Sequence, residues 1–393
     1  MDRCPQDKPW QGTEDPPGQT RETGRADGTG RIAAMEPISD ARLAYALSPE
    51  GLREAAGKCA RGKMWKPSVT SWALNRQKRC SDLSMRLLSG EYGFPEPHHF
   101  ELSRPKRRDC SAPTFEDRVF QRSLIDNVVY EDMTTSLIPS NCACRKGMGT
   151  DRSRDLLVRD LRRHWHRYGT DGGIMLLDVA GYYPNKPHEL AKEVFRSRLP
   201  PDVYAYVEAS LDAQRARAAH DDGDGFGPRG YEAGSELMQV AGICDLDGMD
   251  HYIKQGLRAV AYGRYMDDFY VIDHDLEYLR CAMESIAGYL GSLGYALNVK
   301  KSRIQPLTEP IPWLGYTYRL TESGKVVVRL KSEKWREHTR RLRRMRRAFD
   351  EGRMSREAVD EVYESYLKEL TGRHVTRKQV VKFEKFYREL WRA

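Results

Sequence analysis

Two adjacent aspartates stand between two stretches of aromatic and β-branched residues, and this arrangement restricts the fold more than any other feature. The stretch AYGRYMDDFYVID begins at Ala261. Its flanks, Ala259–Tyr265 and Phe269–Ile272, predict the two strands of a β-hairpin with Asp267 and Asp268 at the bend. A hairpin end lets a sheet present acids to solvent without burying them. Asp is also an ordinary turn residue, so the pair alone indicates only a turn.

A third acid follows a buried strand elsewhere in the chain. The run Ile174–Leu177 is continuously apolar after two glycines, which is typical of a buried strand, and Asp178 ends it. If one sheet pairs this strand with the hairpin, three carboxylates meet at one edge and repel one another. A bound cation relieves that repulsion, and hard oxygen ligands favour Mg²⁺ or Mn²⁺. Two such ions about 4 Å apart can promote phosphoryl transfer.

Basic side chains are expected to grip a triphosphate opposite these acids. Arg104, Lys106, Arg107 and Arg108 form a compact cluster on a turn, and Arg118 lies one helical stretch later. A run of charge is also typical of a solvated face, and that interpretation stays open for the cluster taken alone.

Helical periodicity dominates the rest of the chain. Apolar residues at helical intervals predict short helices in Ser39–Leu88, a helix from about Phe115 with acids in its first turn, and a helix over Leu276–Leu293 that packs on a sheet. A short strand is predicted at Lys325–Leu330, followed by basic helices. The segment Arg319–Arg347 holds twelve Lys or Arg against three Glu, within a net charge of +8. Such a segment is compatible with a polyanionic partner but does not prove one.

Two segments offer little to bury. Met1 to about Ile32 consists mainly of Gly, Pro, Asp, Glu, Thr and Arg, so a disordered tail is expected. The stretch His220–Gly230 has three aspartates in a pattern similar to a calcium loop. Phe226 stands where another ligand is required, so a solvated loop is predicted instead.

Cysteine usage and hydropathy bear on the compartment. Eight scattered cysteines form no C-x-x-C pair, and the chain has no run of eighteen apolar residues and no apolar block at its N-terminus. A reducing, cytoplasmic setting without a membrane partner is expected.

Five motifs, in order, resemble those of bacterial reverse transcriptases over about Leu43–Leu330. YMDD is similar to the family's Y-x-D-D box, and DVAGYY to its first catalytic box. The other three motifs are RPKRRDCSAPTFEDRVFQ for the fingers, LNVKKS for the block after the hairpin, and WLGY for the primer grip. Within the family, NCACRKGMGT, GSELMQ and DGMDHYIK look most like the enzymes of diversity-generating retroelements. Retron enzymes are the nearest alternative, although their VTG signature is not apparent.

The resemblance implies roles for individual residues. Lys301 would donate a proton to the leaving pyrophosphate, with a solvated lysine as the alternative. Tyr183 would be the aromatic gate that excludes a 2′-hydroxyl, with a core aromatic as the alternative, and Gln239 would lie beside the nucleotide and template. Asp178, Asp267, Asp268 and the carbonyl of Val179 would hold two Mg²⁺ or Mn²⁺ ions, and Lys106 and Arg108 would contact the triphosphate. The predicted primer and template contacts are Arg104, Arg118, Arg145, Trp313, Gly315, Tyr316, Arg340, Arg343 and Arg344.

The chain departs from the family pattern at two places. Met238 occupies the small Ser position before Gln239, where it would crowd the nucleotide site. Asp109 and Cys110 are more polar than the usual apolar pair.

The expected architecture is an α+β right-hand polymerase, with fingers, a palm of antiparallel sheet packed on helices, and a helical thumb. Its divisions would be a disordered tail at 1–35, an N-terminal helical extension at 36–100, fingers at 101–173, a palm at 174–318 with an insert at about 200–235, and a basic thumb at 319–393.

The expected activity is RNA-templated DNA synthesis from a DNA or RNA primer with deoxynucleoside triphosphates. The resemblance also implies a small basic accessory protein. Three alternatives remain open at this stage: a retron-type or antiphage reverse transcriptase, an RNA-dependent RNA polymerase, and a non-catalytic protein that binds RNA or DNA.

Overall fold

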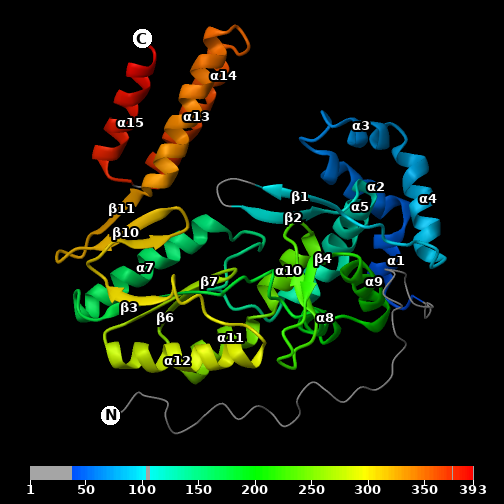
Figure 1. Ribbon diagram of the computed structural model, residues 1–393, viewed down its shortest axis with the longest axis horizontal. Coiled ribbons are helices and arrows are strands. Elements are labelled where there is room, and N and C mark those ends of the chain that lie inside the picture. Colours follow the sequence, from blue (N-terminus) through cyan, green and yellow to red (C-terminus); the bar gives the residue numbers. More distant parts are fainter. Residues whose placement is uncertain (1–37, 103–106, 374, 393) are drawn as a thin grey trace.

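The structure is a computed structural model, and it describes residues 38–102, 107–373 and 375–392. At its centre is a four-stranded antiparallel sheet in the order β6-β7-β3-β8 (Figure 1). The four strands are β3 (Gly173–Asp178), β6 (Ala261–Tyr265), β7 (Asp268–Asp273) and β8 (Arg303–Pro306). The hairpin β6–β7 therefore pairs directly with the apolar strand β3, as the sequence predicts.

Both faces of this sheet are covered by helices. Ile174 and Leu176 of β3 pack in one core with α7 (Thr150–Tyr168), whereas Met175 and Leu177 pack in another with α12 (Leu276–Ser292). Successive side chains of a strand point to opposite faces, so a strand that is buried on both sides is apolar at every position. This is why β3 has a continuous apolar run.

The N-terminal helices form a separate cluster on α5 (Phe115–Leu124). They are α1 (Ala41–Leu47), α2 (Pro49–Ala60), α3 (Pro67–Leu74) and α4 (Arg76–Leu88). Thr114 caps α5 through a capping box with Asp117, which satisfies backbone donors at the start of the helix. The predicted helices of Ser39–Leu88 and the helix from Phe115 are confirmed.

Two small hairpins and several helices connect this cluster to the sheet. The hairpins are β1 (His98–Leu102) with β2 (Arg108–Ala112), and β4 (Arg215–His220) with β5 (Arg229–Tyr231). The loop predicted at 220–230 joins β4 to β5. The helices are α6 (Tyr130–Thr134), α8 (His188–Arg196), α9 (Pro201–Asp212), α10 (Glu236–Cys244) and α11 (Asp247–His251), with π-helical segments at Ile125–Val129 and Tyr252–Gly256.

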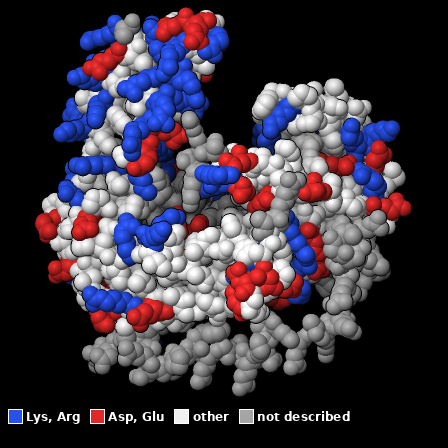
Figure 2. Space-filling view, viewed as in Figure 1, with Lys and Arg blue, Asp and Glu red and all other residues white. Residues whose placement is uncertain are grey.

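The C-terminal region consists of a three-stranded sheet and three helices. The sheet contains β9 (Ile311–Trp313), β10 (Tyr316–Leu320) and β11 (Val326–Leu330). The helices α13 (Ser332–Asp350), α14 (Arg356–Gly372) and α15 (Arg377–Leu390) project from it. Figure 2 shows Lys and Arg crowded over these helices, and a hollow between them and the N-terminal helices.

Some expectations are corrected, and others lie outside the described residues. The first strand of the central hairpin begins at Ala261 rather than Ala259, because the Ala259 N–H donates to the Ile253 carbonyl. The expected tail, Arg104 and Lys106 fall in stretches that the structure does not describe. The residue limits of fingers, palm and thumb stay predictions. Among the described residues, no helix is long and apolar enough to cross a membrane.

Candidate active site

The three predicted carboxylates meet at one end of the central sheet. Asp178 ends β3 and lies directly opposite Asp268, which begins β7. Asp267 lies in the turn between β6 and β7, and its carbonyl accepts a hydrogen bond of 3.3 Å from the Val179 N–H. The register of two strand pairs therefore brings together acids that are about ninety residues apart in sequence.

These carboxylates are less exposed than a hairpin end suggests. Asp178 is buried at 4% exposure, and Asp267 and Asp268 are half-buried. Burial raises the pKa of Asp268 to about 7, and the charges of Asp267 and Asp178 add to this shift. Burial also raises the pKa of Asp267, with a further contribution from Asp178. Asp267 and Asp268 keep part of their surface exposed at the hairpin end, and a cation would relieve the repulsion among the three carboxylates.

The turn that carries Asp267 is held by a buried arginine. Met266 has a φ of 57°, in the left-handed region of backbone conformation that residues other than Gly rarely adopt. Arg264 Nη1 donates to the Met266 carbonyl at 3.1 Å, and Arg264 Nη2 donates to the Ile243 carbonyl at 2.9 Å. Asp250 pairs with the same guanidinium, and both side chains are fully buried. Sequence reasoning missed this pair; the only signal was an Arg within an apolar strand.

Donors from the LNVKKS motif already contact Asp178. Lys301 Nζ forms an ion pair with Asp178 Oδ1, and Asn298 Nδ2 donates to Asp178 Oδ2 at 2.9 Å. Sequence reasoning anticipated Lys301 but missed Asn298. Among the described residues, no group of three or more His, Cys, Asp or Glu is arranged to hold a metal ion. The oxygens present suit Mg²⁺, but a cation on Asp178 Oδ1 would have to replace Lys301, whose side chain is 57% exposed.

Tyr183 lies beside this acidic cluster. Its side chain is half-buried, and its pKa is raised by burial first and also by nearby charges that include Asp267. A Cβ added at Gly242 would lie 3.0 Å from Tyr183 Oη and 3.2 Å from Met266 Cε. Gly242 of α10 thus leaves room for both side chains.

A buried polar network lies beneath Tyr183. Lys186 forms an ion pair with Asp245, and both side chains are fully buried. Tyr295 donates to the same carboxylate at 2.8 Å, and Tyr182 donates to it as well. Because each buried polar group has a partner, the loop that carries Tyr182 and Tyr183 is firmly placed.

The region around Gln239 explains one departure from the family pattern. Gln239 is exposed on α10, with its Oε1 4.0 Å from Cys144 Sγ. Met238 is 1% exposed and packs in the core of the N-terminal cluster. Met238 thus packs inside a core that Tyr183 and Met266 border, while Gln239 at the next helix position is exposed, and crowding of the nucleotide site by Met238 stays a prediction.

The basic residues predicted to bind phosphates fall in different environments. Arg108 is exposed on β2, and its charge acts to lower the pKa of Asp267, against the larger effect of burial. Arg118 lines a cavity of 790 Å³ with Lys66 and Phe115. Arg145 Nη1 donates to the carbonyls of Ile138 and Asn141, at 2.8 and 3.0 Å.

The predicted primer contacts separate into buried and exposed groups. Trp313 and Tyr316 are 3% and 0% exposed; Trp313 donates to Ser153 Oγ at 3.2 Å, and Tyr316 donates to Glu369 at 2.8 Å. Their rings therefore support the core, while the turn between them, with Gly315 at φ 89°, is partly exposed. By contrast, the other three predicted contacts on α13 are exposed: Arg340, Arg343 and Arg344.

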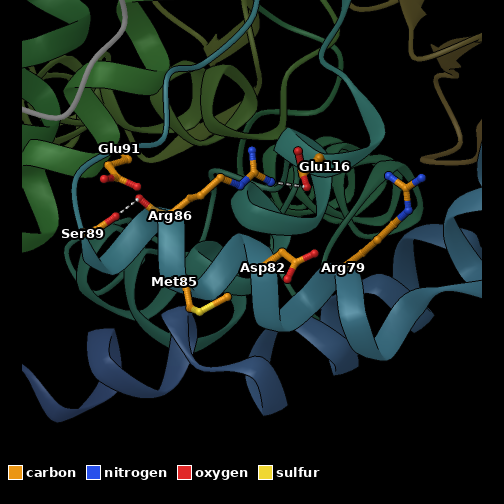
Figure 3. A pocket seen from close by; sticks show the side chains of 7 residues that line it. All are labelled: Arg79, Asp82, Met85, Arg86, Ser89, Glu91 and Glu116. Atoms are coloured by element: carbon orange, nitrogen blue, oxygen red, sulfur yellow. Dashed lines mark hydrogen bonds and ion pairs between the residues drawn. The ribbon is translucent and has the colours of Figure 1, made fainter.

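A pocket of 650 Å³ lies away from the carboxylates, on α4 and the start of α5 (Figure 3). Arg86 crosses it to pair with Glu116 at 2.7 Å. The pocket contains two arginines and three acids: Arg79, Arg86, Asp82, Glu91 and Glu116. This mixture of charges does not suit a polyanion, and the Arg86–Glu116 pair links the N-terminal helices to α5.

Comparisons with known proteins give only weak similarities. No protein-family model matches the chain, and no curated protein sequence matches it. One similar solved structure is telomerase from Candida albicans in complex with a TWJ fragment of telomeric RNA, at 14% identity and a TM-score of 0.44, over 76% of this chain and 59% of that one. Another is apo telomerase from Candida tropicalis truncated from its C-terminal domain, at 14% identity and a TM-score of 0.45, over 59% of this chain and 55% of that one. The chain thus spans less than two thirds of either protein, and similarity at this level assigns no function.

Proposed function

We propose that this protein is an RNA-templated DNA polymerase of the reverse transcriptase type. The observation that carries the proposal is the position of Asp178 opposite Asp268, with Asp267 in the adjoining turn, at the end of a sheet covered by helices on both faces. The activity is inferred from the resemblance of the five motifs to those of reverse transcriptases. Two of these motifs, DVAGYY and YMDD, supply the acids that converge. Within that class, an enzyme of a diversity-generating retroelement is the favoured type.

The acidic cluster would hold two Mg²⁺ ions, with Mn²⁺ as a substitute, through Asp178, Asp267, Asp268 and the Val179 carbonyl. When bound, these ions supply Lewis-acid activation of the primer hydroxyl and neutralise charge on the triphosphate. Lys301, released from Asp178, would be placed to protonate the leaving pyrophosphate. Arg108 would contact the triphosphate from the side of β2.

The remaining residues would position substrate and duplex. Tyr183 would exclude a ribose 2′-hydroxyl through its ring, since a half-buried ring backed by a polar network cannot readily move aside. The exposed arginines of α13 would follow the phosphates of a primer–template duplex lying in the hollow of Figure 2. A small basic accessory protein remains part of the proposal.

Primer extension on an RNA template tests the proposal. The wild-type protein with Mg²⁺ and deoxynucleoside triphosphates is expected to extend the primer, and Asp267→Asn to lose at least about a thousandfold of that rate. Glu284→Gln, an exposed acid on α12, is the matched control and should extend normally. Equal extension by the wild type and Asp267→Asn would show that the assigned site is wrong.

One observation favours a second candidate, a non-catalytic protein that binds RNA or DNA. Lys301 and Asn298 occupy both oxygens of Asp178, so this carboxylate also has a complete structural role without a metal. Binding of an RNA–DNA hybrid that is unchanged by removal of Mg²⁺, with no nucleotide incorporated, would support this candidate.

A further inference from the structure

Another cavity lies at the far end of the hairpin from the carboxylates. It has a volume of 430 Å³ and is bounded by the end of α7, by Val260 and Ala261 before and at the start of β6, and by Ile272 and Asp273 at the end of β7. A strand of this length spans roughly 15 Å. The cavity is therefore separate from the proposed active site.

The cavity has an apolar floor and a basic rim. Ala261, Ile272 and Tyr168 supply carbon surface, and the ring of Tyr168 is itself stacked on His274 with centroids 4.0 Å apart. Arg163 and Arg167 stand at the rim, one helical turn apart, and both are exposed. Within the part of the chain that the structure describes, neither guanidinium forms an ion pair.

Two carboxylates lie at the inner end of the cavity. Asp160 accepts a hydrogen bond of 2.9 Å from the Tyr270 hydroxyl, and Asp273 lies 3.0 Å from His274 Nδ1. Both carboxylates are buried, whereas the two arginines are exposed to solvent, and the charge of Arg163 acts on Asp160. The remaining lone pairs of the Asp160 carboxylate are acceptors for a polar group that reaches the inner end.

The rim continues as a stripe of arginines along α7. Arg152, Arg159, Arg163 and Arg167 are spaced by seven, four and four residues, so they share one face of the helix, and all four are exposed. The stripe is roughly 22 Å long. Of the four, Arg159 has an acidic neighbour, Asp160, at 3.6 Å.

We infer that this cavity and stripe form a second nucleic-acid site, which binds an unpaired nucleotide of an RNA strand that runs along α7. A base fits a cavity with an apolar floor and acceptors for its amino group at the inner end, and the arginines at the rim and along the helix match the phosphates on either side. An acidic peptide would match the arginines but not the floor. Structured RNAs present unpaired bases next to helical segments, which is the form of RNA that proteins read most readily.

The site would bind RNA independently of the primer–template duplex in the hollow. Its function would be to anchor a folded part of the template RNA while another part is copied. The inference about binding stands whether or not the protein polymerises, because Arg163 and Arg167 take no part in the proposed chemistry.

A binding experiment on the full chain tests this inference. The protein is saturated with an unlabelled primer–template duplex, and a labelled, unstructured RNA of about 12 nucleotides is titrated at several salt concentrations. The wild type is expected to bind the labelled RNA with the duplex still in place. Arg163→Gln/Arg167→Gln should weaken binding about tenfold and reduce the slope of log affinity against log salt by about 1.4, the value for two contacts to a single strand.

Controls separate this site from others. Arg76→Gln/Arg79→Gln removes the same charge from exposed positions of α4 and should bind as the wild type does. Extension of a pre-annealed primer by the α7 double variant should be unchanged. If the proposed polymerase function is wrong, neither the wild type nor any variant will extend the primer. Photocrosslinking of RNA that contains 4-thiouridine should label the peptide around Tyr168 or Val260.

Three outcomes would overturn the inference. One is binding by the α7 double variant at wild-type affinity. Another is complete displacement of the labelled RNA by the duplex, which would mean a single shared site. The third is equal competition by polyglutamate or by DNA of the same sequence, which would assign the stripe to an acidic peptide or to DNA instead of RNA.

Discussion

The guanidinium of Arg264 and the carboxylate of Asp250 form a bidentate ion pair without solvent exposure, with Nε 2.7 Å from Oδ1 and Nη2 2.7 Å from Oδ2. The remaining nitrogen, Nη1, donates to the carbonyl of Met266, the residue before Asp267. A charge pair between β6 and α11 therefore fixes the turn that carries the acids. Its loss should affect both stability and the carboxylate geometry.

Arg264→Lys tests this relationship. A lysine has one nitrogen and cannot satisfy Asp250 and the Met266 carbonyl together, so the free energy of unfolding should fall by about 3 kcal/mol. Primer extension should fall about 10- to 100-fold, the usual effect of losing a group that orients metal ligands. Denaturant unfolding and extension assays measure the two effects.

The control is Arg264→Met with Asp250→Leu, which replaces the ion pair by apolar side chains of similar size. This double variant should be more stable than Arg264→Lys, because no buried charge is left unpaired, but less stable than the wild type, because the Ile243 carbonyl and the Tyr262 hydroxyl lose their partners. Extension should remain low. Recovery of full activity would show that Arg264 does not position the turn.

Lys301→Ala should separate ion binding from turnover. With the ammonium group gone, nothing competes with a cation for Asp178 Oδ1, so Mn²⁺ should bind more tightly, by several-fold, in a titration followed by electron paramagnetic resonance. Single-turnover extension should nevertheless slow by about a hundredfold, because the proton donor is lost. Lys300→Ala, at the exposed neighbouring position, should change neither quantity. Weaker Mn²⁺ binding by Lys301→Ala would contradict competition at Asp178.

Substitution of Tyr183 should alter sugar selection. Tyr183→Ala removes the ring, so the ratio of ribonucleotide to deoxynucleotide incorporation should rise by at least about tenfold. Tyr183→Phe keeps the ring and should keep the wild-type ratio. The rates at which the wild type and the two variants incorporate each kind of nucleotide are measured on one RNA template. An unchanged ratio in Tyr183→Ala would show that Tyr183 does not select the sugar.

The stability of the α13–α15 region should depend on pH through His338. This side chain is 5% exposed and stacked on Tyr366, with centroids 3.7 Å apart. Burial lowers its pKa, an effect increased by Lys334 and Arg341 and opposed by Glu369 and Glu337. The folded protein thus binds a proton less readily than the unfolded chain does, so the stability from this group is present above about pH 6.5 and is lost as the pH falls.

Thermal unfolding at about pH 7.5 and about pH 5.5 measures this effect. The free energy of unfolding should fall by about 1 kcal/mol between these conditions through His338, and His338→Phe, which keeps the stacking, should show a smaller fall. His164 and His188 also have pKa values lowered by burial, so the difference between variant and wild type is the relevant quantity. An identical pH dependence in both proteins would exclude His338 as a source.

Local patterns predicted much of the fold for identifiable reasons. Alternation and apolar runs gave the hairpin and β3, because a strand side chain faces one side of its sheet according to its position alone. The convergence of Asp178, Asp267 and Asp268 was predictable, since each follows or begins a strand at the same edge. The helical stripe before Ser292 likewise predicted packing on the sheet.

Side-chain partners were much less predictable. Trp313 and Tyr316 lie in a motif expected at the primer, yet their rings are buried, because the strands β9 and β10 turn them toward α7 and α14. Arg145 was expected to contact a template, yet it hydrogen-bonds two nearby carbonyls. The sequence shows which residue types stand at these positions, but the direction in which each side chain points depends on tertiary packing.

The sequence by itself determined which segments are strands and helices, where the acids fall on them, and which regions are basic, because these properties repeat with the local period of the backbone. Only the tertiary structure decided that Arg264 and Asp250 hold the turn, that Lys301 and Asn298 cover Asp178, and that a cavity opens beside Arg163 and Arg167. Such contacts join segments that are distant in sequence, and their geometry follows from how close-packed layers fit together.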